Sequence, residues 1–284
     1  MSDRLADVAA RIAGIEQLGS VVNAMRGIAG ARIQKAHQEL QAVDAYAGTI
    51  AASLGRILAV APPSDPQQAR QGRDASIVFC AEQGFAGAFS QRVLEAIEGD
   101  SRPRTLLLVG TRGAALATER GLTLEFAAAM PSHSAGVPKL ASDIVDALAA
   151  RIANAQIERV EAIYAEATGG AGLKVVRRPL LPLDPATFSR VARAESPILN
   201  LPVARLLADL TMEYLHALLC EAALHAFAAE NQARVAAMAA AHREIERQLG
   251  LLQANYRQVR QEEITAEIIE LAGGAAAARA ASPR

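Results

Sequence analysis

The sequence predicts an α/β fold in which a small doubly wound, Rossmann-like domain is inserted between two long helices that form an antiparallel coiled coil. The chain has no proline from Val203 to Leu271, where only Gly250 interrupts an Ala/Leu/Glu/Arg/Gln-rich run. A second proline-free stretch opens the chain, and short apolar runs alternate with helical patterns between the two. We expect three parts: an N-terminal coiled-coil helix over 1–61, an α/β domain over 75–182 and a C-terminal coiled-coil helix over 203–272.

The C-terminal stretch is predicted to be one unbroken helix. Proline costs roughly 3 kcal/mol and glycine roughly 1 kcal/mol inside a helix, so their near-absence favours continuity. At the helical rise this run is roughly 100 Å long, too long to be buried within its own globule, so it needs a partner helix or a larger body. Its apolar seam follows steps of three and four with a one-residue offset, which is not a strict heptad. The seam consists of Leu249, Leu252, Tyr256 and Val259, then Ile264, Ile268 and Leu271.

The opening stretch is predicted to be helical over residues 2–60. Apolar residues recur there at steps of three and four, as in Leu5, Val8, Ile12 and Ile15. Six glycines (14, 19, 27, 30, 48 and 55) lower the intrinsic helicity but permit close approach of a partner helix. The proline-rich segment Pro62–Pro66 ends the helix.

Between the helices the period changes to that of an α/β domain. Strands are predicted at 76–81, 105–110, 159–167 and 173–181, with a weaker one at 122–126. Helices are predicted from the glycine-containing turn at 83–87 through Ile97, and over 139–153. Continuous apolar strands alternating with helices indicate a mostly parallel sheet covered on both faces. The short loop Thr168–Gly172 indicates an antiparallel hairpin at one edge.

Composition limits the function classes. The 284 residues carry a formal net charge of -1, with a pI near 6.5, so whole-chain electrostatics give no reason to expect nucleic acid or anionic lipid as a partner. Cys80 and Cys220 form no spacing motif and are interpreted as reduced thiols in a cytoplasmic compartment. The first residues resemble neither a signal nor a transit peptide, and no apolar run approaches the ~18 residues of a membrane span.

Two metal-ligand pairs lie on the C-terminal helix. Glu213 and His216 form a Glu-x-x-His pair as found in di-iron bundles, but such a site needs a second copy and two further glutamates. His216 and Cys220 share a helix face, yet two ligands do not make a zinc site. We therefore expect no metal, and solvated or partner-facing side chains instead.

The α/β domain raises the hypothesis of a nucleotide site. The first turn carries Gly84 and Gly87, but the sequence has neither G-x-G-x-x-G there nor a G-x-x-x-x-G-K-[ST] loop. The segment Gly110–Gly113 is equally well an ordinary strand-to-helix turn. We expect no cofactor and no catalytic residues. A noncatalytic helical scaffold or adaptor with an α/β module is one hypothesis that fits these observations.

Sequence motifs near both ends of the chain resemble those of one protein family. Residues 230–238 read ENQARVAAM and residues 255–270 read NYRQVRQEEITAEIIE, followed by a Gly/Ala tail. In order, spacing and position these stretches resemble the closing helix of the gamma subunit of F-type ATP synthases. Asn23-Ala24-Met25 and the following residues through Arg32 resemble that family's N-terminal helix. Two departures leave both a housekeeping subunit and a divergent paralogue open: the uncharged Gln17–Val22 replaces lysines and threonines, and Gly84–Ala88 replaces a Gly-Leu-Cys-Gly-Gly-like turn.

The resemblance implies a noncatalytic rotor shaft that couples ion-driven rotation to conformational change at catalytic sites on beta subunits. It implies as partners the alpha and beta subunits, an epsilon-type subunit and the c-subunit ring, with no nucleic acid, and membrane association only through the complex. The place would be the cytoplasmic face of the bacterial inner membrane, peripherally bound. By position, Arg260, Gln261 and Thr265 are similar to a polar cluster that contacts a beta-subunit loop, and Met25 to a contact residue on the facing helix. Coiled-coil packing of Met25, and simple solvation of Arg260 and Gln261, are the alternatives.

Overall fold

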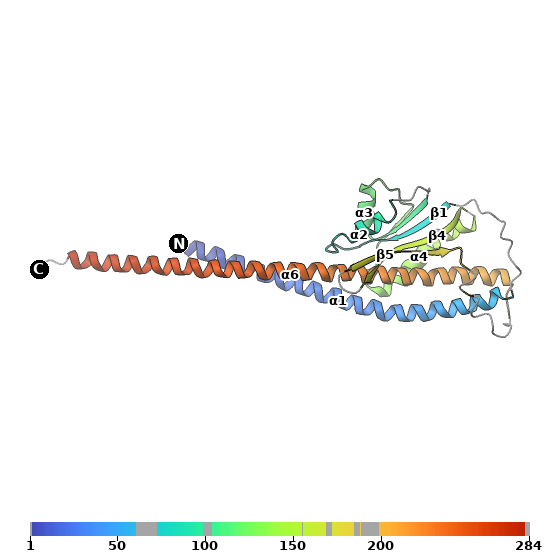
Figure 1. Cartoon of the computed structure of the whole chain (residues 1–284), viewed down its shortest axis with the longest axis horizontal. Helices are drawn as coiled ribbons and strands as arrows, with labels where there is room; N and C mark the ends of the chain where they lie inside the picture. The colour runs from blue at the N-terminus through green and yellow to red at the C-terminus, as the bar shows by residue number, and fades with distance from the viewer. Residues whose placement is uncertain are drawn as a thin grey trace. The chain divides into compact units, whose positions relative to one another are not determined.

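The two predicted long helices are present, and in sequence they stand before and after the domain that carries the sheet (Figure 1). A computed structural model of the chain describes residues 2–60, 73–98, 104–154, 156–168, 172–184, 188 and 199–281. The helices are α1 (Ser2–Leu58), α2 (Phe89–Glu95), α3 (Thr111–Glu119), η1 (Ser134–Gly136), α4 (Val137–Ala153) and α6 (Val203–Ala281). The strands are β1 (Arg73–Phe79), β2 (Arg104–Val109), β3 (Phe126–Ala128), β4 (Ile157–Thr168) and β5 (Gly172–Leu181). The predicted linker at Pro62–Pro66 lies outside the described residues.

The chain falls into two compact units. Met1–Gly27 and Ala237–Arg284 form one, called here the terminal-helix unit, and Ile28–Ala236 forms the other, called the domain unit. Helices α1 and α6 each contribute to both. The α/β fold class with long terminal helices is therefore confirmed, and each unit has its own packing.

The sheet of the domain unit has the order β3-β2-β1-β4-β5. Neighbouring strands are parallel except β4 and β5, which pair antiparallel from Val160↔Leu181 to Thr168↔Gly172. The prediction of a mostly parallel sheet with an antiparallel hairpin at one edge is confirmed. β1 is the central strand, with β2 on one side and β4 on the other. Its last five residues are buried.

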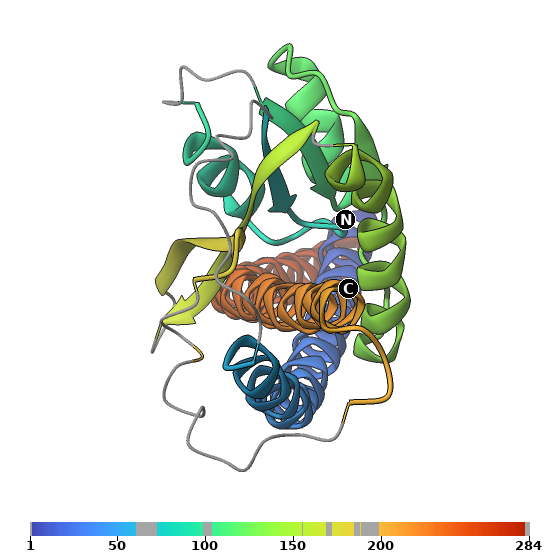
Figure 2. The ribbon, with the colours of Figure 1, turned by 90° about the vertical axis from the view of Figure 1, so that its right-hand side faces the viewer.

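Helices cover both faces of this sheet. Ile77, Phe79 and Leu107 point to one face, where they pack with α4 and with the half of α6 in this unit. Val78 and Leu108 point to the other face, toward α2 and α3. This alternation follows from the period of two along a strand. Figure 2, which looks nearly along the long helices, shows α6 and α4 on one side of the strands and α2 on the other.

Some element boundaries differ from the sequence prediction. The third strand was placed at 122–126, which is wrong: β3 is Phe126–Ala128. Leu122 still donates a backbone hydrogen bond to Ala117 O at 3.0 Å, so it closes the end of α3, and its side chain packs under that helix. At the other extreme, α6 continues to Ala281, past Leu271, because alanine-rich sequence favours helix.

The terminal-helix unit is an antiparallel helix pair, as predicted. Val22, Met238 and Ile245 form its apolar centre. A Cβ on Gly19 would lie 3.4 Å from Ile245, so glycine brings the helices close there. Further along, Arg4 forms an ion pair of 3.6 Å with Glu262. Residue numbers thus fall on α1 as they rise on α6.

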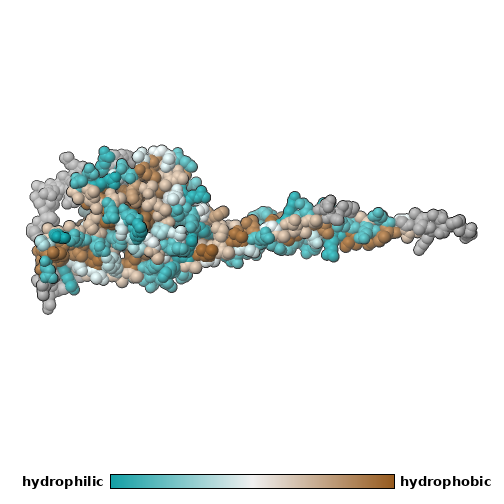
Figure 3. Space-filling model, turned by 180° about the vertical axis from the view of Figure 1, so that it is seen from behind, coloured by the Kyte–Doolittle hydropathy of each residue, from teal (hydrophilic) through white to brown (hydrophobic). Residues whose placement is uncertain are grey.

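The predicted seam of α6 is only partly covered. Val259 is buried, but Ile264, Ile268 and Leu271 are 48%, 60% and 68% exposed. Arg4 already lies opposite Glu262, so little of α1 remains to cover the residues that follow. Figure 1 shows α6 extending past the start of α1, and Figure 3 shows apolar residues interspersed with polar ones along its surface.

Candidate functional site: exposed α6 residues and the turn after β1

Three of the predicted contact residues are exposed near the end of α6. Arg260, Gln261 and Thr265 all face solvent. The hydroxyl of Thr265 donates to the backbone carbonyl of Gln261 at 2.8 Å, so its proton is used within the helix. The side chains that can donate outward are therefore the Arg260 guanidinium and the Gln261 amide, while Thr265 offers an acceptor oxygen.

Met25 is not part of the same cluster. It is half-buried and packs against Val22, Met238 and Ile245. Met238 precedes Arg260 on α6 by about 33 Å at the helical rise. The structure brings Met25 into the coiled-coil packing and leaves it well apart from the polar patch.

The densest polar cluster lies elsewhere, where α6 meets the turn after β1, defined as residues 82–87. On α6, Glu230, Asn231 and Arg234 are only 3%, 1% and 4% exposed. The carboxylate of Glu230 accepts from the amides of Glu82 and Gln83, at 3.2 and 3.1 Å. The sequence did not predict this site, because Glu230, Asn231 and Arg234 contributed there only to the family resemblance.

Arg234 completes the cluster. Its Nε donates to the carbonyl of Gly84 at 3.2 Å, and its two terminal nitrogens donate to Asn231 at 2.8 Å and to Glu230 at 2.5 Å. Asn231 donates in turn to the carbonyl of Phe227 at 2.8 Å. A charged pair on neighbouring helical turns, set in an otherwise alanine-rich run, was the sequence signal that could have revealed it.

Glu82 fills the place at which doubly wound folds usually bind ligands. Such folds bind at the carboxyl ends of the parallel strands, with anions at a helix N-terminus. Here the Glu82 carboxylate accepts from the backbone N–H and the hydroxyl of Thr111, both at 2.9 Å, and from Met130 N at 2.9 Å. One backbone N–H at the N-terminus of α3, that of Thr111, is therefore occupied by a carboxylate of the chain itself.

Close packing accounts for the glycines beside this edge. Gly110 has φ +107, and a Cβ there would lie 2.4 Å from the carbonyl oxygen of Cys80. A Cβ on Gly113 would lie 2.0 Å from Cys80 Cβ. The Gly110–Gly113 segment is thus a packed strand-to-helix turn. At the tip of the preceding turn, Phe85 has φ 61 and is 65% exposed.

The suspected metal ligands have other partners. Glu213 accepts a hydrogen bond from Tyr46, which raises the pKa of that phenol to about 12. His216 Nε2 lies 3.0 Å from the carbonyl of Pro138. Among the described residues, no three His, Cys, Asp or Glu side chains gather as a metal site would require. Cys80 and Cys220 are free and buried, and burial raises the pKa of each thiol to about 12.

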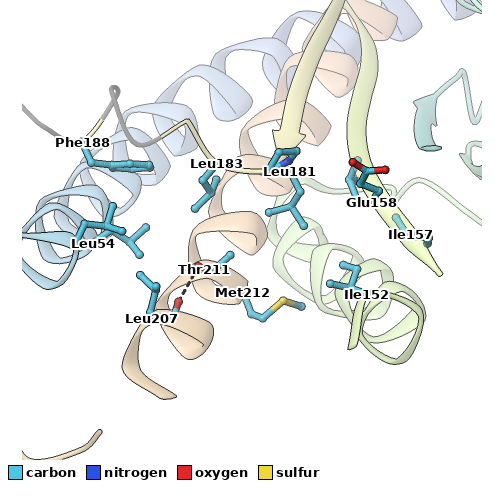
Figure 4. Close-up of a pocket in the computed structure, with 13 residues that line it drawn as sticks. Leu54, Ile152, Ile157, Glu158, Leu181, Leu183, Phe188, Leu207, Thr211 and Met212 are labelled. Carbon is cyan, nitrogen blue, oxygen red and sulfur yellow. Dashed lines mark hydrogen bonds between the residues drawn. The ribbon is translucent and has the colours of Figure 1, made fainter. Parts of the chain in front are cut away.

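An apolar cavity of about 270 Å³ lies at the opposite end of the domain unit (Figure 4). Leu54, Leu207 and Met212 line it together with Phe188, which stacks edge-on against Tyr214 at 5.4 Å. The hydroxyl of Thr211 donates a hydrogen bond to the carbonyl of Leu207 at 2.7 Å. Glu158 is the charged residue of the lining. Ligand sites generally need several converging polar groups, and this cavity offers one carboxylate.

Taken together, the described residues define a class of α/β protein in which a mostly parallel sheet domain is inserted in sequence between two long terminal helices. Within the part of the chain that the structure covers, no helix combines the length and apolar character needed to cross a bilayer.

The chain belongs to the ATP synthase family, whose sequence profile matches residues 4–278. It is similar to the ATP synthase gamma chain of Symbiobacterium thermophilum, with 25% identity over 97% of this chain and 98% of the relative. It is also similar in fold to a chain of the Euglena gracilis mitochondrial ATP synthase solved with OSCP, F1 and c-ring, at TM-score 0.67 and 15% identity, covering 99% and 96% of the two chains. A chain of the rotor from that organism's enzyme gives TM-score 0.62 and 14% identity, with 93% and 100% covered. Family and fold together support the role of a gamma-type central rotor shaft.

Proposed function

We propose that the chain is the noncatalytic central shaft of a membrane rotary ATP synthase or ATPase. It couples ion-driven rotation of a c-subunit ring to conformational change at catalytic sites on beta subunits. The observation that carries this proposal is the fold itself: paired terminal helices on an α/β domain, aligned over nearly the full length with a solved rotor chain. The parts would be an N-terminal helix over 1–61, a domain over 75–182 and a C-terminal helix over 203–272.

A shaft transmits free energy only by making different contacts with different states of its partners. The terminal-helix unit has the surface for this, because Leu18, Val21 and Leu251 are 53%, 55% and 60% exposed. Exposed apolar surface of this kind is typical of regions that contact other proteins. We place this unit against alpha and beta subunits, and the domain unit against an epsilon-type subunit and the c-ring. Attachment to the cytoplasmic face of a bacterial inner membrane would be peripheral, through the complex alone.

Copurification tests the proposal. A tagged chain expressed in its native host should bring down alpha and beta subunits in ring stoichiometry, and ATP turnover by that ring should become cooperative when the chain is present. The purified chain alone should hydrolyse no ATP. A chain recovered without any ATPase subunits, or bound to an unrelated assembly, would favour the scaffold alternative.

We further propose that Arg260 and Gln261 bind a partner loop through their outward donors. Hydrogen bonds to a charged partner contribute roughly 1.5–3 kcal/mol each, so Arg260→Ala with Gln261→Ala should lower the steady-state ATP turnover of the complex severalfold. The matched control is Arg257→Ala with Gln258→Ala, the same two residue types about one turn earlier and also exposed. Equal turnover in the two assembled double variants would remove the assignment.

Met25 and Thr265 make smaller contributions in this proposal. Met25 would touch a partner with the part of its surface that the coiled coil leaves open, and Thr265 would accept a hydrogen bond. Thr265→Val keeps the shape and removes the acceptor, and Met25→Leu keeps the packing. Both should assemble, with turnover reduced less than in the Arg260 and Gln261 double variant.

A further inference from the structure

We propose that Glu230 and Arg234 form a buried latch that fixes the rotational register of α6 against the α/β domain. Through it, torque applied to the domain turns the helix without slip. This inference rests on the proposed shaft function and deepens it, since it names the residues through which the domain is bonded to α6. The two residues are positioning residues for the coupling and belong to no reaction centre.

The latch connects α6 to one short segment of backbone. Glu230 holds the amides of Glu82 and Gln83, and Arg234 holds the carbonyl of Gly84. Three successive residues of the turn after β1 are thus bonded to two side chains one helical turn apart. A one-turn slip of α6 would break all three bonds at once.

The Glu230–Arg234 pair is buried and charged, so its hydrogen bonds to the turn fix the orientation of α6 about its axis. The side chains of Arg234 and Glu230 are 5% and 4% exposed. Apolar faces resist separation but have little angular preference, whereas charge-assisted hydrogen bonds in a low dielectric demand a fixed geometry. Removing one partner leaves an uncompensated buried charge, so the pair tolerates no partial release. Another α6-to-sheet ion pair, Arg178–Glu221, has side chains 31% and 18% exposed and is better screened by solvent.

The gripped turn passes the constraint to the rest of the domain. The Glu82 carboxylate binds Thr111 at the start of α3 and Met130 after β3. The Gln83 side chain accepts from Arg32 on α1 at 3.1 Å. One turn therefore joins α6, α1 and two further elements of the domain. The latch residues lie in the last turns of α6 before Ala237, at which the terminal-helix unit begins in sequence.

The test compares Glu230→Gln with Glu244→Gln in the assembled complex. Glu230→Gln keeps the side-chain shape and removes the charge from the buried pair. Glu244→Gln removes a carboxylate from the exposed Glu244–Arg247 pair on the same helix and serves as the control. Two quantities are measured: ions pumped per ATP hydrolysed, and hydrogen exchange at the amides of Glu82 and Gln83.

We expect Glu230→Gln to keep ATP hydrolysis within about twofold of wild type and to lower the pumping ratio at least threefold. Exchange at the two amides should rise at least tenfold, with no change in either quantity for Glu244→Gln. Faster exchange with an unchanged pumping ratio would overturn the torque role and leave a structural one. Unchanged exchange would overturn the latch itself.

A second variant covers a failure to assemble. Glu230→Gln with Arg234→Gln removes both charges and leaves no unpaired ion, so it should assemble and show the same loss of coupling. If this variant also fails to assemble, exchange in the wild-type complex decides: amides of Glu82 and Gln83 that exchange as fast as exposed turns overturn the proposal. A wild-type chain that joins no ATPase ring would instead reject the shaft function, while exchange on the full chain would still report whether the latch holds.

Discussion

Helix α6 has two different environments along its length, and the contrast explains its sequence. Between Leu215 and Asn231, in the domain unit, every residue except His216, Glu221 and His225 is buried. From Glu246 to Gly273, in the terminal-helix unit, Val259 alone among the described residues is fully buried. A helix covered on all sides is apolar around its circumference, whereas one with a single partner needs only a stripe. One continuous helix can therefore be a core element in one unit and a surface element in the other.

The largest expected effect tests this contrast directly. Leu219 is 0% exposed and Leu251 is 60% exposed on the same helix. Leu219→Ala should cost about 2–5 kcal/mol of the free energy of unfolding, because it leaves a cavity in a packed core. Leu251→Ala should change that free energy by less than about 0.5 kcal/mol. Denaturant unfolding followed by circular dichroism measures both, and similar losses in the two variants would contradict the difference in environment.

Much of this fold follows from local sequence. The absence of proline predicts the two long helices, and the apolar runs around Val78 and Leu108 predict the central strands. Both signals act over a few neighbouring residues. The third strand fails because Leu122 and Leu124 are apolar for another reason: they pack beneath α3 while the chain is still leaving that helix.

The sites depend on contacts that local patterns do not encode. Glu230 and Arg234 have the spacing of an ordinary surface pair, and their burial comes from a turn nearly 150 residues earlier in the chain. Met25 and Arg260 were grouped by family position, yet the register of the antiparallel pair places Met25 beside Met238. Exposure of Arg260, Gln261 and Thr265 is visible in the structure, but their partner contacts stay a prediction.

A half-buried ion network in the domain unit should give a smaller, pH-dependent effect. Glu161 accepts from Ser76 at 2.7 Å, from Arg104 at 2.9 Å and from Arg177 at 2.7 Å. Burial by itself would raise the pKa of Glu161, but the hydrogen bonds from Arg177 and Ser76 and the nearby guanidinium charges outweigh it, so the pKa lies below the ordinary 4.5.

The sign of the pH dependence follows from that lowered pKa. Stability from the ionised Glu161 is fully present above pH 4.5 and is lost as the pH falls through the folded-state pKa. Glu161→Gln should cost less than about 1 kcal/mol near neutral pH, after allowance for solvent screening. In denaturant unfolding, the difference in free energy of unfolding between wild type and Glu161→Gln should become smaller below pH 4.5. A gap that widens toward acid would show that burial dominates this carboxylate.

The smallest effect on stability is expected from the exposed Glu244–Arg247 pair in the terminal-helix unit. This pair shows that a lowered pKa does not by itself imply a contribution to stability. Hydrogen bonds from Arg247 and Gln248 lower the pKa of Glu244 to about 2. Taken alone, this shift would mean stability that is present above the ordinary pKa and lost as the pH falls toward 2. Yet the side chains of Arg247 and Glu244 are 61% and 50% exposed, so water and salt screen the pair and ordering two flexible side chains offsets the attraction. Glu244→Gln should therefore leave the thermal midpoint unchanged at pH 7 and at pH 3, in low and in high salt. A midpoint lowered by more than about 2 °C at pH 7, and restored by salt, would mean that surface charge stabilises the thin helix pair in a way that its apolar stripe does not.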